Sequence, residues 1–265
     1  MRKAGKISIT LLFLISLLCF TAPLICPYDP DMINLDSIKE PPSLQHLLGT
    51  DNKGRDILSR VLHGGRISIS IAFVAGFLSV GVGLMVGVFS GYVGGRIDTA
   101  LMALIDLILS FPAFLLAIGI SVLFPPGIYT VMIAIAAVGW ASFARLIRGH
   151  VLTVKDATFI ESSRAIGCSQ IRILFVHVMP QCIPLVLVIM GLKLGSYILT
   201  EASLSFLGLG AQPPTATWGS MISANRAYIS SAPWMVFFPG LMIAITSLCF
   251  NMLGDALRDK YDVRI

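Results

Sequence analysis

Long runs without a charged residue constrain this chain more than any other feature of its sequence. The runs of 20 residues or more that contain no Asp, Glu, Lys or Arg include Ile7–Cys26, Ile67–Gly95 and Ala227–Gly254. A helix that crosses a bilayer needs roughly 20 mostly apolar residues. Only 12% of the residues are charged, against roughly 25% in soluble domains. The chain is therefore expected to be an all-α integral membrane protein.

Three further apolar segments complete a prediction of six transmembrane helices. Thr99–Phe124 contains one carboxylate, Asp106, and Gln181–Thr200 contains one ammonium group, Lys193. Pro125–Ala144 supplies the remaining segment. Six spans place both ends of the chain on the same side of the membrane.

Glycine and proline positions predict how two of these helices are shaped. Gly83, Gly87 and Gly91 recur every four residues, which predicts a ridge without side chains that another helix approaches closely. Pro112 lies inside the third segment, where it is expected to kink the helix because it lacks a backbone N–H.

The basic residues predict the orientation. With a cytoplasmic N-terminus, the inside segments hold twelve Lys and Arg residues and the outside segments hold six, as the positive-inside rule requires. The first run is longer than the apolar part of a signal peptide, so it is expected to stay as a span. The chain then divides into an N-terminus with first span (1–26), an external segment (27–66) and a membrane core (67–265), with a cytoplasmic loop (145–181) and an external loop (207–233).

Charge and cysteine usage exclude other classes. The pI of about 9.1 is explained by membrane topology and does not call for a nucleic acid. The five cysteines are odd in number and lack paired spacing, which argues against a disulfide framework and a zinc site. The four histidines share no ligand spacing either, so no metal site is expected. The sequence shows no nucleophile paired with a nearby base, so an intramembrane enzyme is not indicated.

The loop 145–181 contains signals for two short helices. Thr153 is a candidate N-cap, and Gly167 is a candidate helix end. Ser169 is placed to cap a second helix, which Pro180 is expected to end. Such a pair of helices could lie on the membrane surface or dock in a groove of a partner. The apolar positions of the second helix are Ile171, Leu174, Phe175 and Val178.

The spacing within this loop resembles the EAA loop of ABC importer permeases. That loop reads Glu-Ala-Ala, three residues, Gly, nine residues, and Ile-x-Leu-Pro. Here Glu161, Ser162 and Ser163 are followed by Gly167 and Pro180 at the same spacing. The departures are serines in place of both alanines, and His177 and Met179 in place of Ile and Leu.

Three more motifs narrow the resemblance to dipeptide, oligopeptide and nickel permeases, and to their second, C-type subunit. Residues 48–56 read LGTDNKGRD, residues 205–210 read SFLGLG, and residues 250–259 read FNMLGDALRD. Together with the EAA loop they cover nearly the whole chain in the expected order. The positions of the first motif are Leu48, Gly49, Thr50, Asp51, Gly54, Arg55 and Asp56.

The resemblance implies a type I ABC importer permease fold in a bacterial inner membrane, with cytoplasmic coupling helices. The implied partners are a second homologous permease, two cytoplasmic ATPases and an extracytoplasmic substrate-binding protein. The chain has no GxxxxGK[ST] phosphate loop, so ATP and Mg²⁺ would bind to the ATPases, and this subunit is expected to be neither an enzyme nor a holder of a cofactor. The residues implied in coupling are Glu161, Ser162, Ser163, Arg164, Ala165, Gly167 and Pro180.

The implied cargo is a dipeptide or oligopeptide, with nickel or a nickel chelate as the alternative. Specificity in such systems lies largely in the binding protein, so the permease sequence does not decide between them. A stand-alone channel or secondary transporter is the other class of function, and it would work without an ATPase.

Two charges within the predicted spans are candidates for a translocation pathway. Counted at 1.5 Å per residue, Asp106 and Lys193 lie roughly 13–17 Å from the cytoplasmic side. Ionisable residues at that depth are costly and usually face a cavity or each other. They are expected to lie close together or to line one polar pathway, unless they form a structural pair remote from substrate. Tyr197, Thr200 and Glu201 extend the stripe, with Glu201 expected at the external interface.

Overall fold

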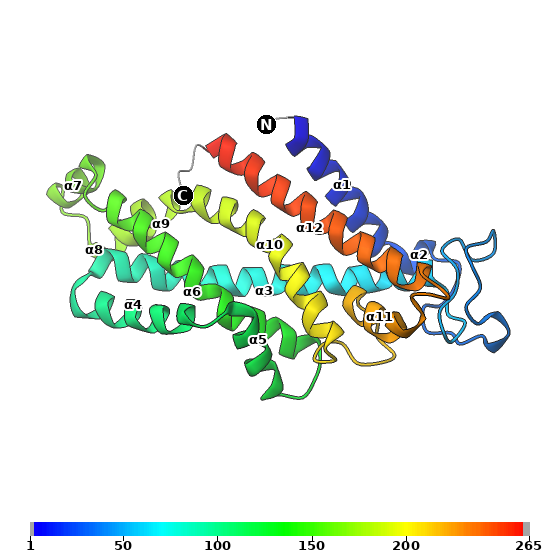
Figure 1. The fold of residues 1–265 in the computed structure, drawn as a ribbon. Coiled ribbons are helices and arrows are strands. Elements are labelled where there is room, and N and C mark those ends of the chain that lie inside the picture. The colour runs from blue at the N-terminus through cyan, green and yellow to red at the C-terminus, as the bar shows by residue number, and fades with distance from the viewer. Residues whose placement is uncertain (1–2, 262–265) are drawn as a thin grey trace.

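The computed structural model describes residues 3–261, which form helices joined by turns and loops (Figure 1). This confirms the all-α class. Within the described residues, the only β-type pairing is an isolated bridge between Thr50 and Asp56. The α-helices are α1 (Lys3–Phe20), α2 (Ala22–Ile25), α3 (Ile57–Val93), α4 (Gly95–Ser110), α5 (Ala113–Val122), α6 (Ile128–Val154), α7 (Thr158–Ala165), α8 (Gln170–Arg172), α9 (Met179–Gln181), α10 (Ile183–Phe206), α11 (Trp218–Asn225) and α12 (Trp234–Tyr261). Two 3-10 helices, η1 (Leu35–Ser37) and η3 (Arg226–Tyr228), and one π-helix, η2 (Ile173–Val178), complete the set.

Four of these helices, α3, α6, α10 and α12, are long and apolar enough to cross a membrane. The helices α4 and α5 meet at a bend of 90° and count as a fifth span if the pair crosses as one. The apolar part of α1, Gly5–Phe20, is shorter than the other spans. By length and composition, the described residues therefore provide four to five spans, where the sequence predicted six.

Pro112 breaks the third predicted span and does not merely kink it. The helix α4 ends at Ser110, and Phe111 adopts an extended backbone with φ −91° and ψ 144°. The residue before a proline is driven into extended conformations because the ring clashes with a helical neighbour. The new helix α5 starts directly after Pro112. The run Thr99–Phe124 is thus divided between two helices.

The helix α3 starts ten residues earlier than predicted, at Ile57 instead of Ile67. Its cap is Asp56, whose Oδ2 accepts a hydrogen bond from the Ser59 N–H at 2.8 Å. The capping carboxylate satisfies one of the free N–H groups of the first turn. The end of the predicted external segment 27–66 therefore belongs to a helix.

The helix α6 continues ten residues past its predicted end at Ala144 and reaches Val154. Residues 145–154 of the predicted cytoplasmic segment 145–181 therefore belong to a helix. The misplaced start of α3 and the misplaced end of α6 have one cause. Basic side chains near a helix end lay their apolar stems along the protein and keep their charge in water. A helix consequently does not stop at the first charged residue.

The glycine ridge of α3 faces α6, which confirms the predicted close approach. A Cβ added at Gly87 would lie 2.6 Å from the Ala144 carbonyl oxygen and 2.9 Å from the Ile147 Cβ. At Gly83 and Gly91 an added Cβ would likewise meet atoms of α6 within 3 Å. Only glycine permits this separation of the two helices.

Small residues also join α10 to α12. A Cβ added at Gly191 would lie 3.0 Å from the Cα of Gly254. The Ser247 hydroxyl donates a hydrogen bond to the Gly195 carbonyl at 3.1 Å. Lipid tails are as apolar as leucine, so close van der Waals contact and such bonds hold membrane helices together.

Two structured ends flank the helices (Figure 1). We call residues 155–182 the α7 end, and residues 26–56 with 207–233 the α11 end. The helices α1 and α12 pack side by side and meet the α11 end at α2 and at the start of α12. Trp218 of α11 is fully buried there, and its Nε1 donates to the Val61 carbonyl of α3 at 2.9 Å. The loops of the α11 end are thereby fixed to the membrane helices.

Candidate functional site

The turn at the α7 end has the form that the sequence predicted. Gly167 has φ +83°, a left-handed conformation that favours glycine. Its N–H donates to the Arg164 carbonyl at 3.0 Å and closes α7. Ser169 Oγ accepts a hydrogen bond from the Arg172 N–H at 3.4 Å and caps α8. The predicted helix end and helix start are confirmed.

The predicted beginning of the first short helix is wrong. Thr153 lies inside α6, where its hydroxyl donates to the His150 carbonyl at 2.7 Å. The helix α7 begins at Thr158, after an extended Ala157 that provides no side-chain cap. Because α6 continues to Val154, Thr153 is not available to start a new helix.

The second short helix is continuous from Gln170 to Gln181, but its middle is the π-helix η2. Pro180 lies within this run, and the break falls at Cys182 instead. Proline cannot donate the helical hydrogen bond and crowds the preceding turn. A wider π turn accommodates that defect. The prediction that Pro180 ends the helix is therefore wrong by two residues.

The π turn also changes which side chains are buried. Ile173 and Val178, five residues apart, are fully buried. Ile171 and Phe175, which belong to the apolar positions predicted for this helix, are 72% and 46% exposed. A helix with i to i+5 bonding shifts its faces relative to a 3.6-residue period. Val178 is the one predicted apolar position that is fully buried.

Most residues that the resemblance implied in coupling lie on the surface of the α7 end. Ser163 is the exception, since it is buried and its hydroxyl donates to the Phe159 carbonyl at 2.8 Å. Ile166 beside them is 80% exposed. Ile171, at the start of the second short helix, is also exposed. The exposed residues of the implied set are Glu161, Ser162, Arg164, Ala165, Gly167 and Pro180.

Side-chain contacts connect the α7 end to two of the long helices. The Tyr92 hydroxyl, near the end of α3, donates a hydrogen bond to the Gln170 side chain. His150 of α6 donates from Nε2 to the Gln181 carbonyl at 3.1 Å. These two contacts attach the second short helix to α3 and α6.

A cavity of about 150 Å³ lies among α4, α5, α6 and α10. Lys193 of α10 lines it and is half-buried. Among residues 3–261 the Lys193 ammonium group has no hydrogen-bond or ion-pair partner. The Tyr197 hydroxyl donates to Ser79 Oγ at 3.2 Å at the edge of this cavity. The polar residues lining the cavity are Ser142, Lys193, Ser196, Tyr197 and Thr200.

Asp106 does not line this cavity and does not pair with Lys193. Its carboxylate forms an ion pair with Arg145 instead, between α4 and α6, and both side chains are largely exposed. One turn further along, Arg148 of α6 binds the Asp98 carboxylate through Nε and Nη2, both at 2.6 Å. The sequence suggested no pairing across α4 and α6, because it does not show that these helices are neighbours.

Glu201 is fully buried, where an exposed position at the interface was expected. The cause is α11, which folds over this end of α10. One carboxyl oxygen, Oε1, accepts a hydrogen bond from the Ser205 hydroxyl at 2.7 Å. The other, Oε2, has no hydrogen-bond partner within the described part of the chain. Glu201 does not line the cavity of Lys193.

The LGTDNKGRD motif forms a tight loop around the carboxylate of Asp51. Arg55 donates to Asp51 Oδ2 from both Nε and Nη2 at 2.7 Å. The N–H groups of Lys53 and Arg55 donate to Asp51 Oδ1 at 2.8 and 3.0 Å. Arg60 lies against the same carboxylate at 3.8 Å and binds Asp31 at 2.9 Å. These buried charges are paired, as charges in protein interiors must be.

Other motif positions give this loop its shape. Gly49 and Gly54 have φ of +80° and +72°. A Cβ at Gly54 would overlap the backbone of Asn34, so this position accepts only glycine. Thr50 accepts a hydrogen bond from the Glu40 N–H at 2.9 Å. Two further motif residues hold the loop to its surroundings: Leu48 packs against the apolar cluster of the α11 end, and Asp56 binds His46.

The side chains of Asn52 and Lys53 are not used to build the loop. Both line a second cavity at the α11 end. Neither residue has a role that the sequence predicted, although both lie within the motif. Within the described residues, no group of three or more His, Cys, Asp or Glu side chains is placed to hold a metal ion.

Comparison with known families assigns most of the chain. The family described as "Binding-protein-dependent transport system inner membrane component" matches residues 83–265. The family described as "N-terminal TM domain of oligopeptide transport permease C" matches residues 1–42. An inner-membrane transport component is a multi-pass transporter subunit and not an enzyme.

Curated relatives agree with this assignment. The oligopeptide transport system permease protein OppC of Bacillus subtilis (strain 168) is 38% identical over 263 residues, covering 99% of this chain and 86% of the relative. The glutathione transport system permease protein GsiD of Escherichia coli O157:H7 is 43% identical over 242 residues, covering 91% and 80%. GsiD of Pectobacterium atrosepticum is 42% identical over 253 residues, covering 94% and 83%.

The fold has a counterpart among solved structures. An inward-facing structure of the MetNI methionine ABC transporter superposes with a TM-score of 0.64 at 17% identity, covering 78% of this chain and 98% of that chain. At this identity the likeness establishes the ABC importer permease fold alone. The family matches and the relatives establish more: this chain belongs to the OppC-type permeases, the inner-membrane components of binding-protein-dependent ABC importers.

Proposed function

We propose that this chain is the C-type permease subunit of a bacterial ATP-driven importer of small peptides. It forms the pathway with a second homologous permease, is driven by two cytoplasmic ATPases that bind ATP and Mg²⁺, and receives substrate from an extracytoplasmic binding protein. The observation that carries the proposal is the exposed surface of the α7 end. Its Glu161 to Gly167 spacing is that of a coupling loop, and exposed Ile166 and Ile171 lie beside it.

This role requires six crossings with both termini in the cytoplasm. Four crossings are α3, α6, α10 and α12, and the bent pair of α4 and α5 is the fifth. The helix α1 is the sixth, with α2 continuing it toward the α11 end. The excess of basic residues in the segments between crossings supports this orientation. The α7 end then lies in the cytoplasm, and the α11 end lies outside the lipid bilayer.

Coupling follows from how the α7 end is attached. Closure of the ATPase pair displaces α7, and the turn at Gly167 carries the displacement into the second short helix. That helix is separated from α10 by Cys182 alone, so a rigid shift of one moves the other. The bonds of Gln170 to Tyr92 and of Gln181 to His150 pass the same movement to α3 and α6.

Replacing Ala165 with cysteine tests the proposal directly. Ala165 is exposed on α7, so the new thiol is expected to crosslink to a cysteine in the ATPase cleft when the complex is treated with a short bifunctional reagent. The background is a variant with Cys168→Ser, because Cys168 lies close by. Ser231→Cys, exposed at the α11 end, is the matched control and should give no ATPase adduct. An adduct from Ser231→Cys, or none from Ala165→Cys, contradicts the proposed orientation.

The substrate class rests on the relatives. OppC and GsiD are named for oligopeptide and glutathione transport, and glutathione is itself a tripeptide. Both names point to a cargo with a peptide bond and a carboxylate. Nickel finds no support among these relatives, so the nickel alternative is not taken further.

The cavity of Lys193 is our proposal for part of the pathway. Lys193, Tyr197 and Thr200 line it from α10. Asp106 and Glu201 are left out, because one is paired with Arg145 and the other is enclosed beneath α11. An unpaired ammonium group in a cavity that is otherwise mostly apolar provides a binding site for an anionic group of the passing substrate.

Lys193→Met is expected to stabilise the chain and impair transport. Methionine removes an unpaired charge at mid-membrane, where a lysine costs about 2.5–3.5 kcal/mol in full contact with lipid. Because Lys193 is only half-buried, we expect a gain of about 1 kcal/mol in the free energy of unfolding. Uptake of a labelled dipeptide should fall about fivefold, while Lys193→Arg keeps most of it. Higher stability with unchanged uptake would restrict Lys193 to a structural role.

A further inference from the structure

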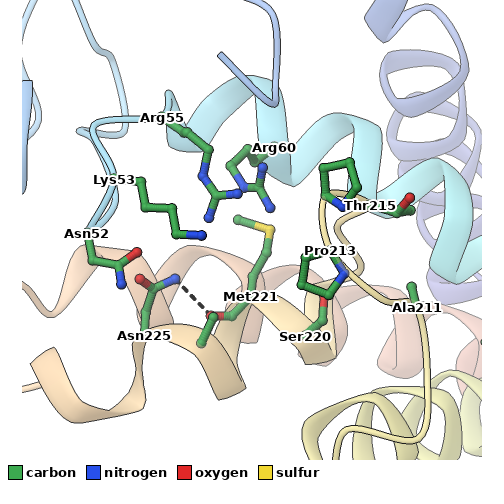
Figure 2. Close-up of a pocket in the computed structure, with 12 residues that line it drawn as sticks. Asn52, Lys53, Arg55, Arg60, Ala211, Pro213, Thr215, Ser220, Met221 and Asn225 are labelled. Atoms are coloured by element: carbon green, nitrogen blue, oxygen red, sulfur yellow. Dashed lines mark hydrogen bonds between the residues drawn. The ribbon is translucent and has the colours of Figure 1, made fainter. Parts of the chain in front are cut away.

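A cavity of about 110 Å³ opens at the α11 end, between the LGTDNKGRD loop and α11. Figure 2 shows three basic side chains entering it from the loop and the start of α3, above the helix α11. The opposite wall is formed by α11 and by the proline-containing segment before it. The polar residues lining the cavity are Asn52, Lys53, Arg55, Arg60, Thr215, Ser220 and Asn225.

The charges in this cavity do not balance. Arg55 is neutralised by the two-point contact with Asp51, and Arg60 by Asp31. The Lys53 ammonium group has no hydrogen-bond or ion-pair partner among the described residues. Three cations thus meet two carboxylates, which leaves one positive charge at the cavity. The two bound arginines are fixed in position, whereas the Lys53 side chain is exposed and free to meet a ligand.

Two acceptors in the wall are also without partners. Asn225 is 3% exposed, and its Nδ2 donates to the Met221 carbonyl at 2.9 Å. Its Oδ1 has no hydrogen-bond partner in the described chain, and the same holds for the buried Oδ1 of Asn52. Leaving a buried acceptor unpaired costs about 1–3 kcal/mol. A ligand that combines a carboxylate with nearby N–H donors would satisfy both the cation and the amide oxygens.

The volume of the cavity limits the size of the ligand that it can hold. Its volume corresponds to about four water molecules, which is enough for the end of one acidic side chain and too little for a whole peptide. An aspartate or glutamate in a polypeptide carries its carboxylate close to backbone N–H groups. One acidic residue of a docking protein therefore fits the charge, the acceptors and the volume.

We propose that this cavity receives an acidic side chain of the substrate-binding protein and serves as a docking point for it. The inference rests on the proposed function, which places the α11 end outside the membrane. Lys53 forms the ion pair, Arg55 and Arg60 hold the positive potential around it, and Asn225 accepts from the backbone of the partner. Docking at Lys53 positions the binding protein against the LGTDNKGRD loop, which is packed on the start of α3.

Variants of Lys53 test the proposal in the assembled permease–ATPase complex in nanodiscs. Lys53→Met is expected to weaken the affinity for the substrate-loaded binding protein about tenfold, chiefly at low salt, since exposed charges are screened by ions. Lys53→Arg should stay within about twofold of the wild type. Arg226→Gln, which removes an exposed basic residue of the α11 end outside the cavity, should also stay within about twofold. Biolayer interferometry at two salt concentrations measures all three.

A zero-length carbodiimide crosslink identifies the occupant. This reagent joins an amine to a carboxylate only when the two are in contact, so Lys53 should become linked to an Asp or Glu of the binding protein. Lys53→Arg should lose the crosslink and keep the affinity. Equal affinity losses in Lys53→Met and Arg226→Gln would overturn the proposal, because they would indicate a general electrostatic attraction by the basic residues of the α11 end and not a specific contact. A crosslink from Lys53 to the peptide carboxylate, or to Asp31 or Asp51 alone, would also overturn it.

The two proposals fail in different ways. If the wild-type complex assembles with its ATPases but no binding protein attaches at all, the proposed function is wrong. If the wild type binds and Lys53→Met binds equally well, only the docking point is wrong. The ATPase activity without binding protein should be the same in every variant, since the α11 end, to which Lys53 belongs, lies opposite to α7 (Figure 1).

Discussion

Gly87→Val is expected to prevent accumulation of the folded chain. An added Cβ at Gly87 would lie 2.6 Å from the Ala144 carbonyl oxygen and 2.9 Å from the Ile147 Cβ. Backbone and a β-branched side chain of α6 cannot give way as a flexible side-chain end would, so α3 and α6 must separate. Overpacking typically costs about 1–3 kcal/mol. We expect about 3 kcal/mol or more here, because these two helices share the most extensive contact in the fold.

Gly81 provides the matched control on the same helix. It is exposed, and an added Cβ there meets nothing within 4 Å. Gly81→Val exchanges the same two residue types, and valine is the better helix former of the two. Its melting temperature in detergent should be equal to or above that of the wild type, while Gly87→Val yields little folded protein in size-exclusion chromatography. Similar yields for both variants would show that the α3–α6 contact tolerates a larger separation.

The sequence predicted the membrane helices well because lipid imposes a simple rule. Apolar runs with at most one charged residue located α3, α6, α10 and α12, and the glycine spacing located the contact of α3 with α6. The ends of α3 and α6 were misplaced by ten residues, at Ile57 and Val154, because charge density does not define where a helix stops. A cap such as Asp56 or a continuing hydrogen-bond ladder decides that, and both depend on the surrounding fold.

Relations between distant segments could not be predicted in this way. Asp106 was expected near Lys193 because both lie at a similar depth, but depth does not fix the direction in which a side chain points. In the structure α4 packs on α6, so Arg145 is the partner of Asp106. Glu201 was expected at the interface because it lies near a helix end, and the later α11 covers it.

Within the α7 end, the sequence predicted correctly those features that depend on the backbone conformation of one or two residues. Gly167 and Ser169 have the turn and cap roles that their identities predict. The buried face of the second short helix was predicted wrongly, because a π turn before Pro180 changes the helical period. An apolar pattern read at 3.6 residues cannot reveal that change.

Gly167→Val is expected to uncouple transport while leaving the membrane helices folded. Gly167 has φ +83°, which a β-branched residue adopts only at a cost of about 1–3 kcal/mol. The turn will relax to a different conformation, and α7 will be turned relative to the helix that starts at Ser169. If about 2 kcal/mol is lost from the productive arrangement, uptake of a labelled dipeptide falls about 30-fold. Melting temperature and yield should change little, since an added Cβ at Gly167 meets nothing within 4 Å.

Gly167→Asn separates backbone conformation from side-chain bulk. Asparagine adds a side chain of comparable size in the same open space, but it tolerates the left-handed region far better than valine. Uptake by Gly167→Asn should therefore remain within about threefold of the wild type, and substrate-stimulated ATP hydrolysis should follow uptake in both variants. If asparagine impairs transport as strongly as valine, the added side chain itself obstructs docking in the ATPase cleft. The role of Gly167 is then to let α7 and the ATPase approach closely. If neither variant impairs transport, the α7 end does not couple ATP hydrolysis to this permease.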